Sequence, residues 1–231
     1  MTVKVWCGLV AVSVAFLPSV VWAVGGLSVS SSRIIIDGGR TSSSIVLSNA
    51  SSIPYLTRVL IEDESGNKEE QLIAVPPVAY SPPGRQIRFQ VVVLAPEKLP
   101  VDRESVFYFH SHSVPGNQNS NNALNVALDN RLKVFYRPSG IEGNMVAAIE
   151  GLRWTLKGGV LQATNPSKFN VSLIGVGIDQ SYKQLDHCVI APEQSVRFRL
   201  KKQYPNKVTV RWAAMDDYGS PMRLSTNIAN E

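Results

Sequence analysis

The stretch of residues 122–137 constrains the fold of this chain more than any other, because its apolar side chains recur with a period of two. A period of two predicts an extended strand with one apolar face, since successive side chains of a strand point to opposite sides. The alternating residues are Leu124, Val126 and Leu128. A second apolar run, Leu132 to Tyr136, follows and contains Lys133. At about 15 residues this strand exceeds the usual five or six, so one end can pair in its own sheet while the other offers its edge to something else.

Almost every segment after residue 27 has the pattern of a short strand that ends in turn residues. Such spacing is typical of immunoglobulin-like sandwiches. The first set of predicted strands is 28–36, 45–47, 55–61, 72–75, 86–94, 105–112 and 122–137. The second set is 153–156, 160–164, 170–178, 187–190, 195–200, 207–215 and 222–226. We therefore predict an all-β chain with two immunoglobulin-like β-sandwich domains, residues 24–143 and 144–231, joined by a compact linker.

Proline placement adds one constraint on the first domain. Pro76 and Pro77 directly follow the predicted strand 72–75. Proline cannot donate a hydrogen bond to a sheet ladder. This segment is therefore expected at a sheet edge or at a point where the chain changes sheets.

Residues 1–23 are predicted to be a secretory signal peptide. Lys4 is the only charged residue among them, an apolar run from Val5 to Leu17 follows it, and Ala23 provides a small residue before the cut. This order of basic start, apolar centre and cleavage site is typical of exported proteins. The competing interpretation is an uncleaved membrane anchor, because the apolar stretch reaches roughly 20 residues if Pro18 is tolerated.

The composition of the mature chain excludes some classes of protein. Removal of residues 1–23 from 231 leaves 208 residues, and the loss of Lys4 lowers the net charge from +5 to +4. Only Cys188 remains of the two cysteines, so the fold must be held by burial without an internal disulfide, and we expect this thiol to be a small buried apolar group. The basic residues are scattered without interleaved aromatic residues, which argues against nucleic acid as a partner.

Candidate chemistry is sparse. His110 and His112 fall on one side of a predicted strand at a spacing that could clamp a metal ion. No Cys, Asp or Glu stands at a useful spacing beside them, so polar residues at a strand end are the favoured interpretation. The sequence contains no G-x-S-x-G turn and no Gly-rich phosphate loop. We therefore expect no enzyme activity, no metal, no cofactor and no small-molecule substrate.

A set of short motifs runs through the chain in a fixed order. They are Ser32-Arg33-Ile34, Gly38-Gly39, Pro54-Tyr55, Val75-Pro76-Pro77, Pro83-Gly84, Asp102-Arg103-Glu104-Ser105, Leu132-Lys133-Val134-Phe135-Tyr136-Arg137-Pro138 and Asp217-Tyr218-Gly219. Together they cover essentially the whole mature chain and resemble the periplasmic chaperones of chaperone–usher pilus assembly, of the short-loop type. The resemblance implies two immunoglobulin-like domains in an L, a periplasmic location, and pilus (fimbrial) subunits and an outer-membrane usher as partners.

The resemblance also implies a subunit anchor in the cleft between the domains. In that family a basic pair holds the C-terminal carboxylate of a subunit, and Arg33 and Lys133 occupy the matching positions. A chain-terminal carboxylate is an acceptor-only anion. A guanidinium fork and a lysine ammonium can bind it by charge-assisted hydrogen bonds.

By the same resemblance, Leu124, Val126 and Leu128 match the family's donor strand. That strand is inserted into a groove of a subunit whose own immunoglobulin fold lacks its final strand. Donor-strand complementation of pilins is an established mode of strand addition, and it enters here through the resemblance alone. Periodicity leaves alternatives open: the three side chains could face this protein's own core, and residues 129–131 could form a bulge that re-aims the strand. Strict alternation would place the three on the face opposite Lys133.

Three charged residues are implied to form an ion-pair network between the domains. The matching positions are Glu104, Arg137 and Asp217. Their expected role is to fix the angle between the domains, although partly buried ion pairs lose solvation and their net energy does not follow from the pattern.

The loop before the donor strand bears on which subunits this chain would bind. This loop, Ser113 to Gly116 with the Asn-rich tract after it, departs from the family's more basic version, which contains a Pro-Pro pair, and this leaves subunit specificity open. The alternative function is a pilus subunit or adhesin, which is disfavoured because subunits usually have one incomplete immunoglobulin domain, commonly with a disulfide. An exposed apolar edge is a liability, so a self-capping homodimer of the free protein is also considered as a partner state.

Overall fold

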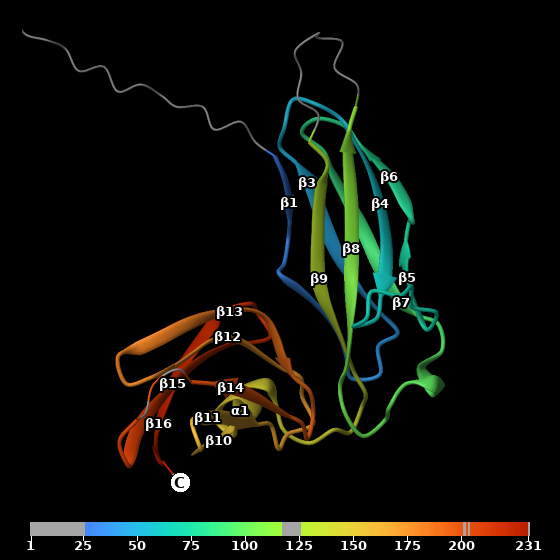
Figure 1. Cartoon of the computed structure of the whole chain (residues 1–231). Coiled ribbons are helices and arrows are strands. Elements are labelled where there is room, and N and C mark those ends of the chain that lie inside the picture. Colours follow the sequence, from blue (N-terminus) through green and yellow to red (C-terminus); the bar gives the residue numbers. More distant parts are fainter. Residues whose placement is uncertain (1–25, 117–125, 201, 203, 231) are drawn as a thin grey trace, which may run out of the picture.

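The computed structural model describes residues 26–116, 126–200, 202 and 204–230. The predicted signal peptide, residues 1–23, and Leu124 of the predicted donor strand lie outside these ranges. Within them, no helix is long and apolar enough to cross a membrane. The described chain forms two β-sandwiches that meet at one end, which confirms the predicted fold class and the L shape (Figure 1).

The first sandwich contains two sheets that pack face to face. Its elements are β1 (Leu27–Val29), β2 (Arg33–Asp37), β3 (Ser42–Asn49), β4 (Tyr55–Glu62), β5 (Leu72–Val75), β6 (Val78–Ser81), β7 (Gln86–Val93), the 3-10 helix η1 (Pro96–Lys98), β8 (Ser105–Pro115) and β9 (Leu128–Arg137). One sheet has the strand order β1-β3-β7-β5 and the other has the order β2-β9-β8-β4-β6. All neighbours are antiparallel except β2 and β9, which run in parallel.

The second sandwich follows a short helix. Its elements are α1 (Met145–Glu150), β10 (Arg153–Lys157), β11 (Val160–Thr164), β12 (Val171–Ile178), β13 (Ser181–Ile190), β14 (Ser195–Arg199), β15 (Lys207–Met215) and β16 (Pro221–Ala229). The sheets have the orders β10-β11-β14 and β13-β12-β15-β16. The first half of β13 was missed by the predicted strand 187–190, because its side chains are mostly polar and hide the alternation. Helix α1 begins after Asn144, whose side chain accepts a hydrogen bond from the backbone of Ala147 at 2.9 Å.

Each sandwich has its own hydrophobic core. In the first core the rings of Phe89 and Phe109 lie 5.9 Å apart between centroids. In the second core the rings of Trp154 and Trp212 lie 5.4 Å apart. Cys188 is half-buried and packs at the margin of the second core, so it contributes apolar contact there, as predicted. Burial in these two separate cores is what holds the two sandwiches together.

The predicted strand 28–36 is wrong in one respect, because the chain changes sheets within it. β1 pairs with β3 in one sheet, whereas β2 pairs with β9 in the other. Between them, the hydroxyls of Ser30 and Ser31 hydrogen-bond to nearby backbone groups at 3.0 and 2.8 Å. The bond from Ser31 to the carbonyl of Arg33 is local, and such bonds offer the backbone an alternative to a continuous ladder, whereas Ser30 accepts from the amide of Val46 on β3. The prediction of a sheet edge or a change of sheets at Pro76 and Pro77 is confirmed, since β5 and β6 are edge strands of different sheets.

The predicted strand 122–137 is shorter than expected, because β9 begins at Leu128. The bulge considered at residues 129–131 is wrong. β9 pairs with β8 without a register shift along the whole of Leu128–Tyr136. Strict alternation therefore holds, and Lys133 lies on the face opposite Leu128.

Replacing Phe109 by alanine should lower the free energy of unfolding of the first domain by about 3–5 kcal/mol. The side chain is 1% exposed, so its removal leaves a cavity beside Phe89. Chemical denaturation of the mature chain would measure the loss. Leu56→Ala is the control, because Leu56 on neighbouring β4 is 53% exposed and should change stability by no more than about 0.5 kcal/mol. Equal losses in the two variants would contradict the assigned core.

Candidate functional site

Two basic side chains, Arg33 of β2 and Lys133 of β9, lie side by side where the first domain meets the second. They are directly opposite each other in the parallel pairing of the two strands, so both side chains lie on one face of the sheet. Burial, and then the charge of Arg33, lower the pKa of Lys133 below its ordinary value. Neighbouring cations repel each other, so an anion bound between them would be stabilising.

The guanidinium of Arg33 is nearly enclosed, with the residue 7% exposed. Its Nη1 donates to the backbone carbonyl of Met215 at 3.4 Å, and its Cζ lies 5.9 Å from the ring centroid of Phe135. Its Nε is buried and has no hydrogen-bond partner among the described residues. Burial lowers the pKa of Arg33, and the charges of Asp217 and Asp216 partly offset that effect. A buried donor without a partner costs free energy, which a suitable acceptor would recover.

This basic pair is suited to an acceptor-only anion. None of the ion pairs formed within the described ranges uses Arg33 or Lys133. A guanidinium offers a planar fork of donors and an ammonium offers a compact charge, and together they match the two oxygens of a carboxylate. The structure thus brings together the two residues predicted for the anchor, although their role in binding remains a prediction.

β9 has an open edge next to the basic pair. β2 pairs only with Lys133 to Arg137, whereas β8 pairs with β9 from Leu128 onward. On the side of β2, residues 128–132 have no neighbouring strand in the part of the chain that the structure describes. Unpaired N–H and C=O groups of this kind can accept another strand.

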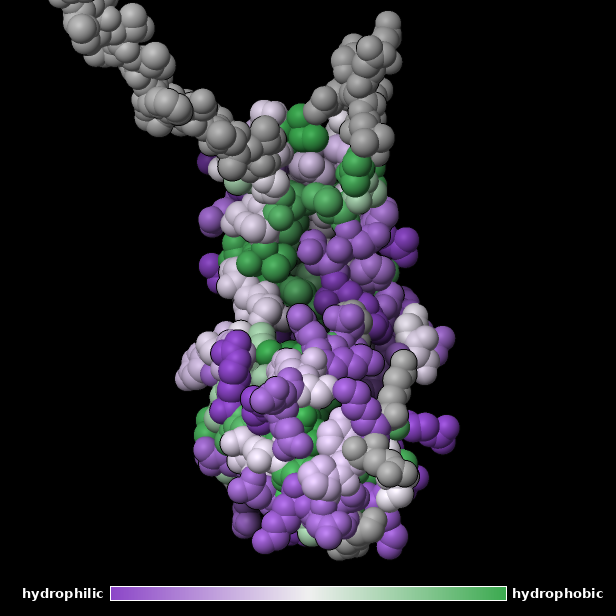
Figure 2. Space-filling model, turned by 60° about the vertical axis from the view of Figure 1, so that its left-hand side comes forward, coloured by the Kyte–Doolittle hydropathy of each residue, from purple (hydrophilic) through white to green (hydrophobic). Residues whose placement is uncertain are grey.

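The apolar face of β9 leaves the core toward this open edge. Leu132 packs against the first core, Leu128 is half-buried, and Val126 is 54% exposed. Leu124 lies outside the described residues. In Figure 2 the cleft side of the molecule comes forward, and hydrophobic residues gather on the first domain above a hydrophilic band at the junction. Two of the three predicted donor residues therefore lie where the apolar face becomes accessible.

Arg137, the last residue of β9, joins carboxylates from both domains. Its Nε and Nη2 donate to Oε1 of Glu104 at 3.1 and 2.9 Å. Its Nη1 and Nη2 donate to Oδ2 and Oδ1 of Asp217 at 3.1 and 3.0 Å. Glu104 precedes β8 in the first domain, and Asp217 follows β15 in the second. The geometry therefore contains the three partners of the predicted interdomain network.

The Glu104 end of this network is the more deeply buried. Its side chain is 0% exposed, and Oε2 accepts a hydrogen bond of 2.7 Å from the backbone of Asn170 in the second domain. Burial raises the pKa of Glu104, while the bonds from Asn170 and the charge of Arg137 oppose this shift. Burial lowers the pKa of Arg137, but the bonds and charges of Asp217 and Glu104 outweigh it, so this pKa is raised. The Arg137 guanidinium also lies 4.8 Å from the ring centroid of Phe169.

Sequence reasoning missed the contributions of Asn170, Phe169 and Met215. None belongs to a motif, and Met215 takes part through its backbone carbonyl, which any residue could provide. Their role follows only from the proximity of the two domains.

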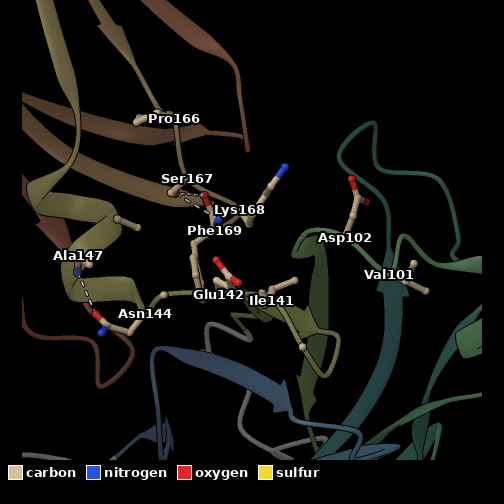
Figure 3. Close-up of a pocket in the computed structure, with 13 residues that line it drawn as sticks. Val101, Asp102, Ile141, Glu142, Asn144, Ala147, Pro166, Ser167, Lys168 and Phe169 are labelled. Carbon is tan, nitrogen blue, oxygen red and sulfur yellow. Dashed lines mark hydrogen bonds between the residues drawn. The ribbon is translucent and has the colours of Figure 1, made fainter.

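A pocket of about 520 Å³ lies at the linker between the domains (Figure 3). Its walls come from residues 140–144, from residues 166–169 and from the segment before Glu104. The charged groups of Asp102, Glu142 and Lys168 do not converge on one point (Figure 3). The pocket is therefore a hollow beside the linker and does not hold a catalytic constellation among its lining residues.

The two histidines singled out in the sequence have partners that the spacing did not reveal. Nδ1 of His110 lies 3.0 Å from Oε1 of Glu62, and Nδ1 of His112 lies 2.6 Å from Oδ1 of Asp129. The hydrogen bond with His112 is the main cause that lowers the pKa of Asp129. Glu62 and Asp129 are on β4 and β9, the two strands that flank β8, so pairing brings them together. Within the described ranges, no group of three such residues is arranged to hold a metal ion.

Comparison with known proteins matches both halves of the chain. The family model for the pili and flagellar-assembly chaperone PapD N-terminal domain matches residues 26–142, and the model for the pili assembly chaperone PapD C-terminal domain matches residues 147–226. The uncharacterized fimbrial chaperone YcbF of Escherichia coli (strain K12) is 31% identical over 201 residues, which is 84% of each chain.

Solved structures have the same fold. The crystal structure of the YadV chaperone matches with a TM-score of 0.76 and 26% identity, covering 87% of this chain and 99% of the other. The SafB complex with the Salmonella enterica SafA pilin contributes a chain that matches with a TM-score of 0.77 and 18% identity, covering 90% of this chain and 98% of the other. At that identity the second likeness concerns the fold alone.

Replacing Arg137 by alanine should lower the free energy of unfolding by about 3–5 kcal/mol, because it leaves the Glu104 carboxylate buried without its counter-ion. Denaturant titration would measure the loss. The double variant Glu104→Gln with Arg137→Ala should recover part of it, since a neutral amide carries no uncompensated charge. If the single and the double variant were equally unstable, the ion pair could not be the cause.

Proposed function

The chain belongs to the PapD family of pilus-assembly chaperones, and from this membership we propose that it binds pilus subunits in the periplasm and delivers them to an outer-membrane usher. It is a fimbrial chaperone rather than a structural subunit of a pilus. The chaperone role is non-catalytic, and we propose no enzyme activity for this chain. The predicted signal peptide supports the periplasmic location.

The observation that carries the proposal is the incomplete hydrogen bonding of Arg33 beside Lys133. Nε of Arg33 is buried without a partner in the described part of the chain, and the burial and charge around Lys133 disfavour its protonated form. One carboxylate placed between the two side chains would accept a hydrogen bond from Nε of Arg33 and would stabilise the protonated form of Lys133. The C-terminus of a subunit supplies such a group at the end of an extended strand, so we assign it as the anchored ligand.

The open edge of β9 supports a donor-strand mode for the rest of the subunit. A subunit strand that runs along residues 128–132 and ends at the basic pair could form main-chain hydrogen bonds with them. The apolar face that emerges at Leu128 and Val126 would then fill the subunit's own core. Membership of the family of pilus-assembly chaperones supports a partner of this class.

The open edge of β9 also bears on how the free protein associates with itself. An unpaired strand that carries exposed apolar side chains can associate with a second copy of itself. We therefore propose that a self-capping homodimer competes with subunit binding, and that subunits displace it.

Lys133→Ala should reduce capture of subunits by at least about tenfold, because it removes one of the two charges that hold the carboxylate. The test is co-expression of the tagged protein with candidate subunits, periplasmic pull-down and mass spectrometry. Lys207→Ala is the matched control, since Lys207 is an exposed lysine on β15 of the other domain. Normal yield of subunits with Lys133→Ala would refute the anchor.

Binding should also weaken at alkaline pH. The anchored carboxylate requires the protonated ammonium of Lys133, and burial lowers the pKa of this group below 10.5. As pH rises through the lowered pKa, the ammonium loses its proton and its ionic contribution to binding disappears. Affinity of the purified complex measured as a function of pH should fall before ordinary lysines titrate, and Lys133→Ala should lack this step.

Val126→Asp should impair subunit capture and leave the stability of the free protein unchanged. The side chain is 54% exposed and outside the strand ladder, so the free protein does not depend on it, whereas a charge would be buried in the subunit groove. Val146→Asp is the control, since Val146 on α1 is 46% exposed in the other domain. Pull-down yield and thermal unfolding would both be measured. Undiminished capture with Val126→Asp would exclude the donor assignment.

A further inference from the structure

We infer that the carboxylate anchor is assembled across the domain interface, with the β15–β16 turn of the second domain, residues 216–220, acting as the positioning element for Arg33. This inference rests on the proposed function, because it concerns how the same anchor is built. It adds that the second domain does more than complete the cleft: it holds the arginine in its binding orientation.

One hydrogen bond to the second domain orients the guanidinium of Arg33. The hydrogen bond from Arg33 Nη1 runs to the carbonyl of Met215, which is 182 residues away in sequence and immediately precedes the turn. No other side-chain hydrogen bond of Arg33 is found within the described ranges, and the stacking contact with Phe135 constrains the plane but not the direction of the fork. The direction of the remaining donors therefore depends on where the second domain places Met215.

The turn of residues 216–220 is held by hydrogen bonds of its own. Oδ1 of Asp216 accepts hydrogen bonds from the backbone N–H groups of Tyr218 and Ser220 at 2.9 and 2.7 Å, and the backbone of Asp216 pairs with that of Ser220 at 3.0 Å. The next residue, Asp217, is held by the fork of Arg137. A turn fixed both within itself and to the first domain can serve as a template for the side chain beside it.

The turn also packs closely against the residue that precedes β2. Gly219 adopts a left-handed conformation with φ of +80°, and a Cβ atom at this position would lie 2.3 Å from Oγ of Ser32. Ser32 directly precedes Arg33. The turn therefore packs against the residue that sets the backbone from which Arg33 projects, and a bulky side chain at Gly219 must displace one of them. The absence of a side chain at Gly219 is what permits this close approach.

A consequence is thermodynamic coupling between ligand and interface. If Arg33 reaches its binding orientation only when the turn is docked, an anchored carboxylate must stabilise the docked arrangement by the same factor by which docking improves carboxylate affinity. Displacement of the turn would then weaken recognition of the carboxylate, while the strand-pairing part of binding at the β9 edge is untouched. That difference separates positioning from a general loss of stability.

The test uses the mature full chain and two synthetic octapeptides of alternating threonine and valine, one with a free C-terminal carboxylate and one with a C-terminal amide. Affinities would be measured by calorimetry. The unaltered protein should prefer the carboxylate by about tenfold or more, the usual worth of a hydrogen bond to a charged group. Gly219→Leu should reduce this preference to about twofold or less and leave affinity for the amide unchanged. Leucine is chosen because rotation of the Ser32 hydroxyl alone could accommodate alanine.

Gly66→Leu is the matched control. Gly66 also has a left-handed conformation, with φ of +84°, but a Cβ atom there meets nothing within 4 Å. It carries the same backbone strain without the contact, so it should keep the preference for the carboxylate. If Gly219→Leu does not fold, Asp217→Asn, which weakens the hold of Arg137 on the turn without adding bulk, should lower the preference in the same direction.

The outcomes distinguish the positioning role of the turn from the carboxylate anchor itself. A preference for the carboxylate that survives in the folded turn variants would overturn the positioning role of the turn and leave the anchor intact. Equal affinity of the unaltered protein for the two peptides, or no binding of either, would overturn the anchor itself. Loss of the preference in Gly219→Leu but not in Gly66→Leu would support both.

Discussion

The fork of Arg137 between Glu104 and Asp217 is the interaction on which the arrangement of this molecule depends. One guanidinium at the end of β9 is shared by a buried carboxylate of the first domain and a carboxylate of the second. An ion pair of this kind contributes little net stability when it forms, because desolvation offsets the attraction, but losing one partner is costly. We therefore propose that its effect is to exclude other domain orientations more than to add stability, which is what a cleft of fixed shape requires.

The orientation of the two domains determines which groups contact each other in the cleft. Docking of the β15–β16 turn places the carbonyl of Met215 on the guanidinium of Arg33 and leaves Nε of the same group without a partner among the described residues. Lys133 stands directly opposite on the neighbouring strand. A protein that holds two cations side by side, and encloses one of them, disfavours the empty state and favours the state with a bound anion.

Strand β9 connects these features. Its C-terminal part is enclosed between β2 and β8 and carries Lys133 and Arg137, whereas its N-terminal part has β8 on one side and an open edge on the other. The difference arises because β2 is only five residues long and begins where the chain leaves the neighbouring sheet. The break before Arg33 thus shortens β2 and, by doing so, leaves the edge that we propose for a subunit strand.

Local periodicity in the sequence was sufficient to predict an all-β chain with two sandwiches, because a strand's side-chain period depends only on neighbours in the chain. It left the relative faces of Leu128 and Lys133 open, because a bulge at residues 129–131 would have re-aimed the strand. Motif resemblance indicated the residues of the anchor and of the ion-pair network. The change of sheet after Val29, the unbroken register of β9 and the contacts of Asn170, Met215 and Gly219 were decided only by the tertiary structure. Each of these depends on which distant segment provides the hydrogen-bond partner, and backbone N–H and C=O groups are alike in every residue, so the spacing of side chains carries no record of that choice.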